Sequence, residues 1–273
     1  MKKILFLASL ALAFTNCSKS NDDDNHDIPA KDYELSEDGL TLKSWKNLDT
    51  KTIDMESDSK LQKVNTIGEY AFRQAAKLES IILPKNLKEI GTGAFYGANL
   101  KGGVTFNTSA KITIGEDAFK STEITTLGLP NLTELSKGAF QGCSKLKEVK
   151  FGKITKIGED AFRGCLSLTE INLDGTDLKE VGRAAFSGCE HIEKVTLPAT
   201  LKKIDNMAFF ACFVFQQLTM KATEVPTLVS ANALDTGSKI KTNIFVPKGT
   251  ENSYKTAENW SYYKDQILVK PEF

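Results

Sequence analysis

Apolar and polar residues alternate in short stretches that return at nearly constant intervals along the chain. Successive side chains of a strand point to opposite faces, so an L-x-x-I-x-L pattern predicts a strand with one apolar face. Four such stretches are LESIIL (78–83), LKEVKF (146–151), LTEINL (168–173) and IEKVTL (192–197). Proline cannot donate to a strand ladder and marks the strand exit. It follows the last apolar residue in three copies, as Pro84, Pro130 and Pro198.

The dipeptide Ala-Phe precedes these stretches seven times, at spacings of 21 to 24 residues. Its phenylalanines are Phe72, Phe95, Phe119, Phe140, Phe162, Phe186 and Phe209. A glycine commonly stands three residues before the alanine, which predicts a turn that a side chain would block. The glycines are Gly68, Gly91, Gly115, Gly158 and Gly182.

Self-similarity at this period is typical of a leucine-rich-repeat solenoid, in which every copy is one turn of a coil. One turn alone cannot bury its Leu, Ile and Phe side chains, whereas stacked turns share a continuous apolar interior. We therefore predict a right-handed coil of short strands joined by turns or short helical segments, with the seven phenylalanines in one column. The predicted solenoid spans residues 61–220.

Two flanking segments lack Ala-Phe and are predicted to cap the open ends of the coil. Residues 33–60 carry alternating apolar residues and form the predicted N-terminal cap. Residues 221–273 form the predicted C-terminal cap, with a strand closed by Pro247, a short helix around Ser253–Ala257 and a last strand at Ile267–Val269. Four aromatic residues of this segment are candidates for plugging the end, namely Tyr254, Trp260, Tyr262 and Tyr263.

The full motif, I-G-x-x-A-F-x-G-C-x-x-L-x-x-I-x-L-P, is most complete at residues 157–173 and 181–198. It resembles the BspA-like leucine-rich repeat family of bacterial cell-surface proteins. Two copies depart from it: LKGGVTF (100–106) carries an extra residue, and Ser121-Thr122 stand where Gly-Cys is expected. We expect small irregularities in the coil at these places. The resemblance implies a non-enzymatic protein that adheres to host or neighbouring-cell proteins.

The N-terminal residues predict export. Lys2 and Lys3 precede an apolar run at residues 4–14, which as a helix rises about 16 Å and is too short for a bilayer core of about 30 Å. We interpret residues 1–16 as a signal peptide. Cys17 and the segment before it resemble a bacterial lipoprotein signal, which implies lipidation of Cys17 and a tether over residues 17–32.

The acidic run at residues 18–25 (SKSNDDDN) resembles the tag that sends some lipoproteins to the outer face of the outer membrane. An ordinary solvated charge run also fits these residues. The resulting expectation is a protein lipid-anchored in the outer membrane and facing the extracellular side.

The charge balance and the cysteine positions limit the kinds of partner and of chemistry to be expected. Lys+Arg and Asp+Glu both number 35, so no basic excess favours a nucleic-acid partner. Four cysteines occupy one motif position in successive turns, as Cys143, Cys165, Cys189 and Cys212. We expect buried thiols, with disulfides and redox or metal chemistry as weaker alternatives, since no C-x-x-C pair exists.

Other candidates for chemistry have ordinary explanations. His191 follows Cys189 closely, which suggests a Cys-His nucleophile, but it fills a slot held by Lys145 and Ser167 in other copies. The carboxylates Glu116, Asp117, Glu159 and Asp160 form a predicted acidic row, interpreted as a solvated face because no calcium-loop motif accompanies it. We predict no catalytic residue, no metal site and no cofactor.

The outward positions of the strand stretches remain as a candidate binding surface. They are polar with mixed charge and no aromatic cluster, which favours a protein partner over a sugar; a merely soluble surface also fits. The candidate ligand-binding residues are Lys147, Glu148, Lys150, Thr169, Glu170, Asn172, Glu193, Lys194 and Thr196. The leading hypothesis is a surface lipoprotein that binds a protein partner. The alternative is a structural, assembly or accessory nutrient-binding lipoprotein of the outer membrane.

Overall fold

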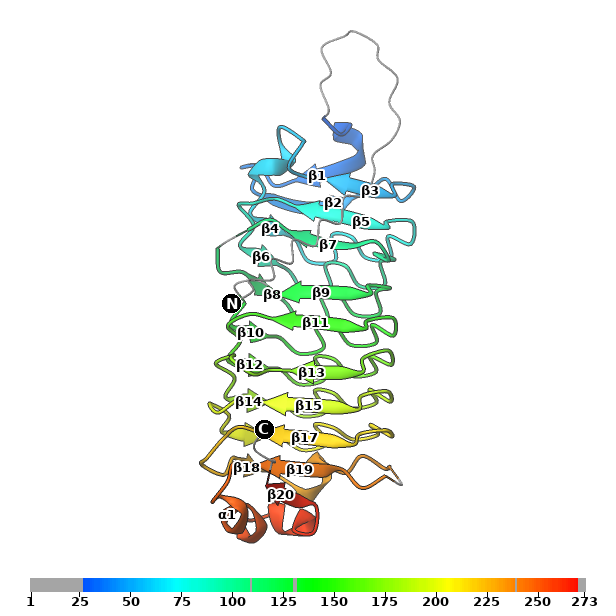
Figure 1. Ribbon diagram of the computed structural model, residues 1–273. Helices are drawn as coiled ribbons and strands as arrows, with labels where there is room; N and C mark the ends of the chain where they lie inside the picture. Colours follow the sequence, from blue (N-terminus) through cyan, green and yellow to red (C-terminus); the bar gives the residue numbers. More distant parts are fainter. Residues whose placement is uncertain (1–26, 109, 130–131, 239, 270–273) are drawn as a thin grey trace, which may run out of the picture.

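The computed structural model describes residues 27–108, 110–129, 132–238 and 240–269. The predicted signal peptide, Cys17 and most of the tether lie outside these residues. The described chain coils into a solenoid in which two columns of short strands run along the long axis (Figure 1). The predicted solenoid fold is therefore confirmed.

One column holds the strands of the L-x-x-I-x-L stretches and is called here the wide column. Its strands run parallel and in register, so that Ile171, Val195 and Leu218 lie side by side. They are β3 (Thr52–Asp54), β5 (Ser80–Leu83), β7 (Gly103–Phe106), β9 (Thr126–Leu129), β11 (Glu148–Phe151), β13 (Glu170–Asn172), β15 (Lys194–Leu197), β17 (Gln217–Met220), β19 (Asn243–Val246) and β20 (Ile267–Val269).

The other column, called here the narrow column, begins with an antiparallel pair and continues with two-residue parallel strands. Its strands are β1 (Tyr33–Leu35), β2 (Thr41–Trp45), β4 (Thr66–Ile67), β6 (Glu89–Ile90), β8 (Thr113–Ile114), β10 (Glu134–Leu135), β12 (Lys156–Ile157), β14 (Glu180–Val181), β16 (Lys203–Ile204) and β18 (Thr227–Leu228). A bridge between Ile112 and Leu132 links its two halves. The repeats use turns in place of helix, and the one α-helix described, α1 (Glu251–Thr256), lies at the C-terminal end.

The seven phenylalanines form one stacked column through the interior, as predicted. Neighbouring ring centroids lie 4.9–5.6 Å apart and neighbouring ring planes differ by 3–9°. Each ring is at most 1% exposed. Burial of such a ring stabilises the fold by about 1.5–3 kcal/mol, and aromatic contact adds about 0.5–1.5 kcal/mol per pair.

Backbone hydrogen bonds hold the Ala-Phe turns at this spacing. The N–H of each phenylalanine donates to the carbonyl of the alanine in the next turn; Phe72 donates to Ala94 and Phe140 to Ala161, at 2.7 and 2.8 Å. The turns also approach each other closely at the motif glycine. A Cβ added to Gly158 would lie 2.5 Å from the carbonyl oxygen of Leu135, which explains why this position takes glycine.

The wide column is interrupted twice, because no hydrogen-bonded ladder joins β7 to β9 or β11 to β13. The interruptions coincide with changes in the loop that returns from a wide strand to the next narrow strand. The loop length can be counted from the central apolar residue of a wide strand to that of the following narrow strand. This count is eight positions after β9 (127 to 135) and after β11 (149 to 157). It is ten positions after the flanking strands β7 (104 to 114) and β13 (171 to 181). Strands β9 and β11 therefore match each other in loop length but differ from both neighbours by two residues.

The N-terminal end of the solenoid is closed by two aromatic residues of the narrow column. Trp45 stacks on Phe72 with ring centroids 5.5 Å apart, and Tyr33 continues the stack at 6.1 Å. Both are 6% exposed. The indole N–H of Trp45 donates to the carbonyl of Asn47 at 2.9 Å, which satisfies the one polar atom of its ring.

The C-terminal end is closed by α1, a 3₁₀ turn at Trp260–Tyr263 and strand β20. Tyr254 and Trp260 are fully buried and donate to the carbonyls of Ala222 and Pro226 at 2.8 and 2.7 Å. Tyr263 is half-buried. Tyr262, which the sequence places among the plugging residues, is 76% exposed, so that expectation is wrong for this residue. It lies next to Tyr263 in the same 3₁₀ turn and points away from the core.

Replacing an interior ring tests the importance of the column. Phe140→Ala is expected to lower the free energy of unfolding by about 3–5 kcal/mol, because it leaves a cavity between two stacked rings. Chemical denaturation measures this change. Phe213→Ala, at a ring that is 46% exposed, serves as the matched control and is expected to change the free energy by less than about 1 kcal/mol. Equal losses in the two variants would contradict the role of the column.

Candidate binding face

The nine candidate residues lie together on the outer face of the wide column, on or next to β11, β13 and β15. Eight of them are exposed and Thr196 is half-buried. Inward side chains of the same strands fill the core; Ile171 and Val195 are each 1% exposed. The alternation along each strand thus separates a core face from a polar outer face.

Six of the nine residues line a groove at the interruption between β11 and β13. This groove has a volume of about 670 Å³ and is open to solvent. The six are Lys147, Glu148, Lys150, Thr169, Glu170 and Asn172. The other three, Glu193, Lys194 and Thr196, lie on or next to β15, outside the groove. Val149, Phe151 and Asp174 also line it and were not among the candidates.

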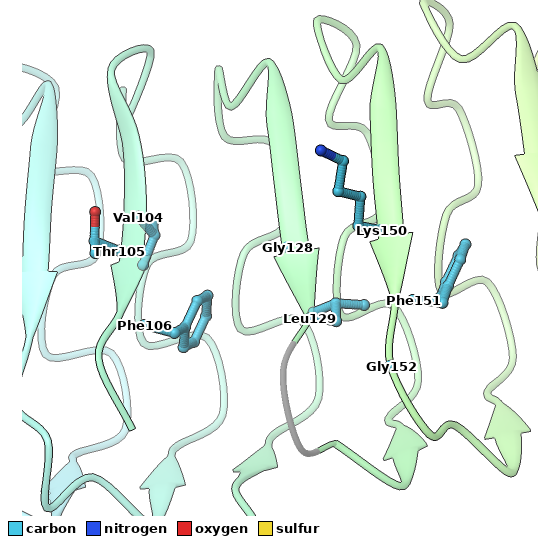
Figure 2. A pocket seen from close by; sticks show the side chains of 8 residues that line it. All are labelled: Val104, Thr105, Phe106, Gly128, Leu129, Lys150, Phe151 and Gly152. Atoms are coloured by element: carbon cyan, nitrogen blue, oxygen red, sulfur yellow. The ribbon is translucent and has the colours of Figure 1, made fainter. Parts of the chain in front are cut away.

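A second depression lies at the interruption between β7 and β9 and extends to β11. Its volume is about 450 Å³. Figure 2 shows Phe106, Leu129 and Phe151 at the ends of the three strands, with Gly128 leaving the strand face uncovered between its neighbours. Phe106 and Phe151 are half-buried, unlike the core phenylalanines, and each ring edge contacts the column, at Phe119 and Phe162.

These apolar groove residues occupy inward positions of the motif, so alternation alone predicts that they are core residues. They are accessible because the neighbouring strands do not pair. The length of the return loop is the sequence feature that distinguishes these accessible residues from core residues at the same motif position. The first interruption adjoins the irregular copy at residues 100–106, where the sequence predicts a disturbance of the coil. The second adjoins the copy at residues 135–152, in which Ser136 replaces the motif glycine and the return loop is short.

The outer face carries charges of both signs with few internal ion pairs. Glu148 and Lys150 lie 3.6 Å apart and are both largely exposed. Glu170 is opposite Lys194 in the β13–β15 register. Within the described residues, Lys147 and Glu170 have no ion-pair partner within 4 Å. An exposed charge without a partner has no ion pair to break when it meets an opposite charge on another molecule. Such charges therefore suit this face to recognition.

Three of the four carboxylates of the predicted acidic row, Asp117, Glu159 and Asp160, form ion pairs. Asp117 lies 3.1 Å from Lys120 and Glu159 lies 2.7 Å from Arg183. The guanidinium of Arg183 holds the pKa of Glu159 below its ordinary value. Among the residues that the structure describes, no group of three or more His, Cys, Asp or Glu side chains is arranged to hold a metal ion.

The four motif cysteines are buried, free thiols in one column, as predicted. Each Sγ donates to the carbonyl of the phenylalanine one turn earlier, at 3.1–3.3 Å; Cys189, for example, donates to Phe162. Burial raises the pKa of Cys189, and it raises that of Cys212 to about 12. His191 is exposed and its Nδ1 lies 2.7 Å from the carbonyl oxygen of Leu166. These contacts do not form a Cys-His nucleophile.

The fold and its outer face define a solenoid that presents an extended, grooved surface. Residues 47–153 and 112–231, together more than half of the chain, match the BspA type leucine rich repeat region in six copies. The chain belongs to the BspA-type leucine-rich repeat family, a family of cell-surface proteins.

Three solved structures of leucine-rich repeat proteins are similar to this chain. A leucine rich cell surface protein from Faecalibacterium prausnitzii A2-165 is 19% identical, with 73% of this chain and 70% of that chain covered and a TM-score of 0.44. The leucine rich repeat protein of T. pallidum is 20% identical, with coverage of 90% and 98% and a TM-score of 0.48.

A leucine-rich repeat protein from Eubacterium ventriosum ATCC 27560 is 21% identical over 77% of this chain and 50% of that chain, with a TM-score of 0.49. No curated protein matches this chain.

Thiol labelling tests the burial of the cysteine column. In the folded protein at pH 8, the four column thiols are expected to react with an aromatic disulfide reagent at least about a hundredfold more slowly than in denaturant, because burial blocks access to all four and raises the thiol pKa of Cys165, Cys189 and Cys212. Mass spectrometry of the labelled peptides measures each site. Rapid labelling of Cys165 or Cys189 in the folded protein would contradict the buried column.

Proposed function

We propose that this protein is a surface-displayed, lipid-anchored binding protein whose wide column recognises a protein partner at the two strand interruptions. The observation that carries the proposal is the coincidence of these interruptions with accessible apolar side chains and partly unpaired charges. Protein interfaces combine an apolar centre with a polar rim. The half-buried Phe106 and Phe151 would supply the apolar centre. Lys147, Glu148 and Glu170 would supply the polar rim.

The edges of the interruptions offer a further kind of contact. Backbone N–H and C=O groups of β7 and β9, and of β11 and β13, have no ladder partner across each gap. Such groups favour hydrogen bonds from the backbone of an extended segment, while neighbouring pockets select its side chains. The partner class is therefore a host or bacterial surface or matrix protein with an accessible extended stretch.

The proposed anchor is a lipid on Cys17, followed by the polar tether. Within the described residues, no helix combines the length and apolar character needed to cross a bilayer. A single lipidated residue would hold the protein at the membrane without a spanning segment. Membership of a cell-surface family supports display on the extracellular side of the outer membrane.

Blocking the groove between β11 and β13 tests partner binding. The full chain is screened by surface plasmon resonance against matrix proteins and proteins of neighbouring cells, and at least one is expected to bind. Thr169→Arg with Asn172→Arg fills the groove and is expected to weaken binding at least about tenfold, or by about 1.4 kcal/mol.

The matched control is Asn252→Arg with Ser253→Arg, which places the same side chains on exposed positions of α1. It is expected to bind the partner as the unmodified protein does. If no protein binds, or if a partner binds the groove variant and the control equally, the proposed binding face is wrong.

Protease treatment of intact cells tests the location. The solenoid is expected to be digested in intact cells, and Cys17→Ala is expected to abolish incorporation of labelled fatty acid and to release the protein from the membrane fraction. Immunoblots of fractions with and without lysis measure both outcomes. Digestion only after lysis would favour the periplasmic assembly or nutrient-binding alternative.

A further inference from the structure

A basic depression lies near the N-terminal end of the solenoid, away from the strand-face grooves. It occupies the edge formed by the return loops, just before β4 and β6. Its volume is about 380 Å³, and its lining includes Lys63, Asn65, Lys85, Asn86 and Lys88. The three lysines are exposed, and none of the described residues that line the depression carries a carboxylate.

Two carboxylates near the depression are occupied by backbone groups, whereas Glu89, which directly follows Lys88, is exposed. Asp58 is fully buried and accepts hydrogen bonds from the amides of Ile28, Lys60 and Leu61 at 2.7–2.8 Å. Glu56 accepts a hydrogen bond from the amide of Lys85. Asp58 and Glu56 are held by these backbone contacts, and within the described residues no ion pair joins Glu89 to a lysine of the depression.

Lysines on the same edge of later turns are arranged differently. Lys153 lies 3.9 Å from Asp177, Lys202 lies 2.5 Å from Glu224, and Lys221 lies 3.3 Å from Asp174. In the described part of the chain, the three lysines of the depression have no carboxylate within 4 Å. The depression thus gathers three lysines without an ion pair from two adjacent turns, whereas among the described residues of later turns such lysines are mostly paired and Lys179 alone repeats the Lys88 position unpaired.

The positions of these groups favour a linear, repeating ligand over a single small anion. The amide of Lys88 donates to the carbonyl of Asn65 at 2.8 Å, so the lysines and asparagines come from adjacent turns. Adjacent parallel strands lie about 4.8 Å apart, which spaces the charges along the solenoid axis. The asparagine amides supply neutral donors and acceptors beside the charges.

We propose that this depression binds an acidic polysaccharide that runs along the loop edge. The ammonium groups of Lys63, Lys85 and Lys88 hold its sulfate or carboxylate groups, and Asn65 and Asn86 contact its hydroxyl groups. No aromatic side chain lines the depression, so it lacks the stacking surface that single-stranded nucleic acids require. The site is independent of the protein-binding face, and its ligand adds a second attachment at a separate place.

Isothermal titration of the full chain with heparin, a sulfated polysaccharide, tests the proposal, with neutral dextran as the uncharged comparison. Heparin is expected to bind at low salt, with an affinity that falls as salt rises, and dextran is not. The triple variant K63Q/K85Q/K88Q is expected to lose at least about tenfold in heparin affinity, which equals about 1.4 kcal/mol.

The triple variant K153Q/K202Q/K221Q is the matched control, because it removes three lysines from the same edge and changes the net charge equally. It is expected to bind heparin within about twofold of the unmodified protein, and thermal unfolding confirms that both variants fold. Failure of the unmodified chain to bind heparin, or equal losses in both variants, would overturn the proposal. Equal affinity for a DNA duplex would also overturn it, by showing a site for polyanions in general.

Discussion

The structure depends on the registered stacking of Ala-Phe turns. The phenylalanine N–H to alanine carbonyl bond fixes the distance between turns, and at this distance the rings stack with centroids 4.9–5.6 Å apart. Alanine keeps the backbone close to the column, and glycine allows the preceding backbone to touch the turn before it. Since each turn is held by both neighbours, its stability is shared along the solenoid. The end turns lack one neighbour, and the aromatic caps at Trp45 and Trp260 replace it.

The surface is shaped by a different part of the repeat. The Ala-Phe turn varies little, whereas the return loop changes length without disturbing the column. Two adjacent short loops follow β9 and β11, which form no ladder with β7 and β13, and both grooves lie at these interruptions. The core therefore tolerates a local change that creates accessible apolar side chains on an otherwise polar face.

The repeat made the core and the strand positions predictable from sequence. Seven Ala-Phe dipeptides at a near-constant spacing identify the column, and the cysteine position identifies the buried thiols. The grooves could not be predicted in the same way, because alternation assigns Phe106 and Phe151 to the interior. Whether a neighbouring strand covers such an inward position depends on strand pairing, which alternation does not specify. Tyr262 shows the same limit at the cap, where two adjacent tyrosines of one turn have opposite environments. Nine outward residues were chosen by alternation, and six of them lie at one groove because loop length places the interruption there.

The cysteine column has a consequence for the conditions under which this fold persists. Its thiols donate to the phenylalanine carbonyl one turn earlier, whereas Thr122, at the same motif position, donates to Phe119 of its own turn at 3.0 Å. Ala75 and Ala98 occupy this position in the first two copies and are also buried. The requirement at this position is thus a small buried side chain, and sulfur chemistry is incidental. All four thiols are free and enclosed, so the packing of these turns includes no disulfide among the described cysteines. The fold therefore does not need an oxidising compartment to close a covalent bond between its turns.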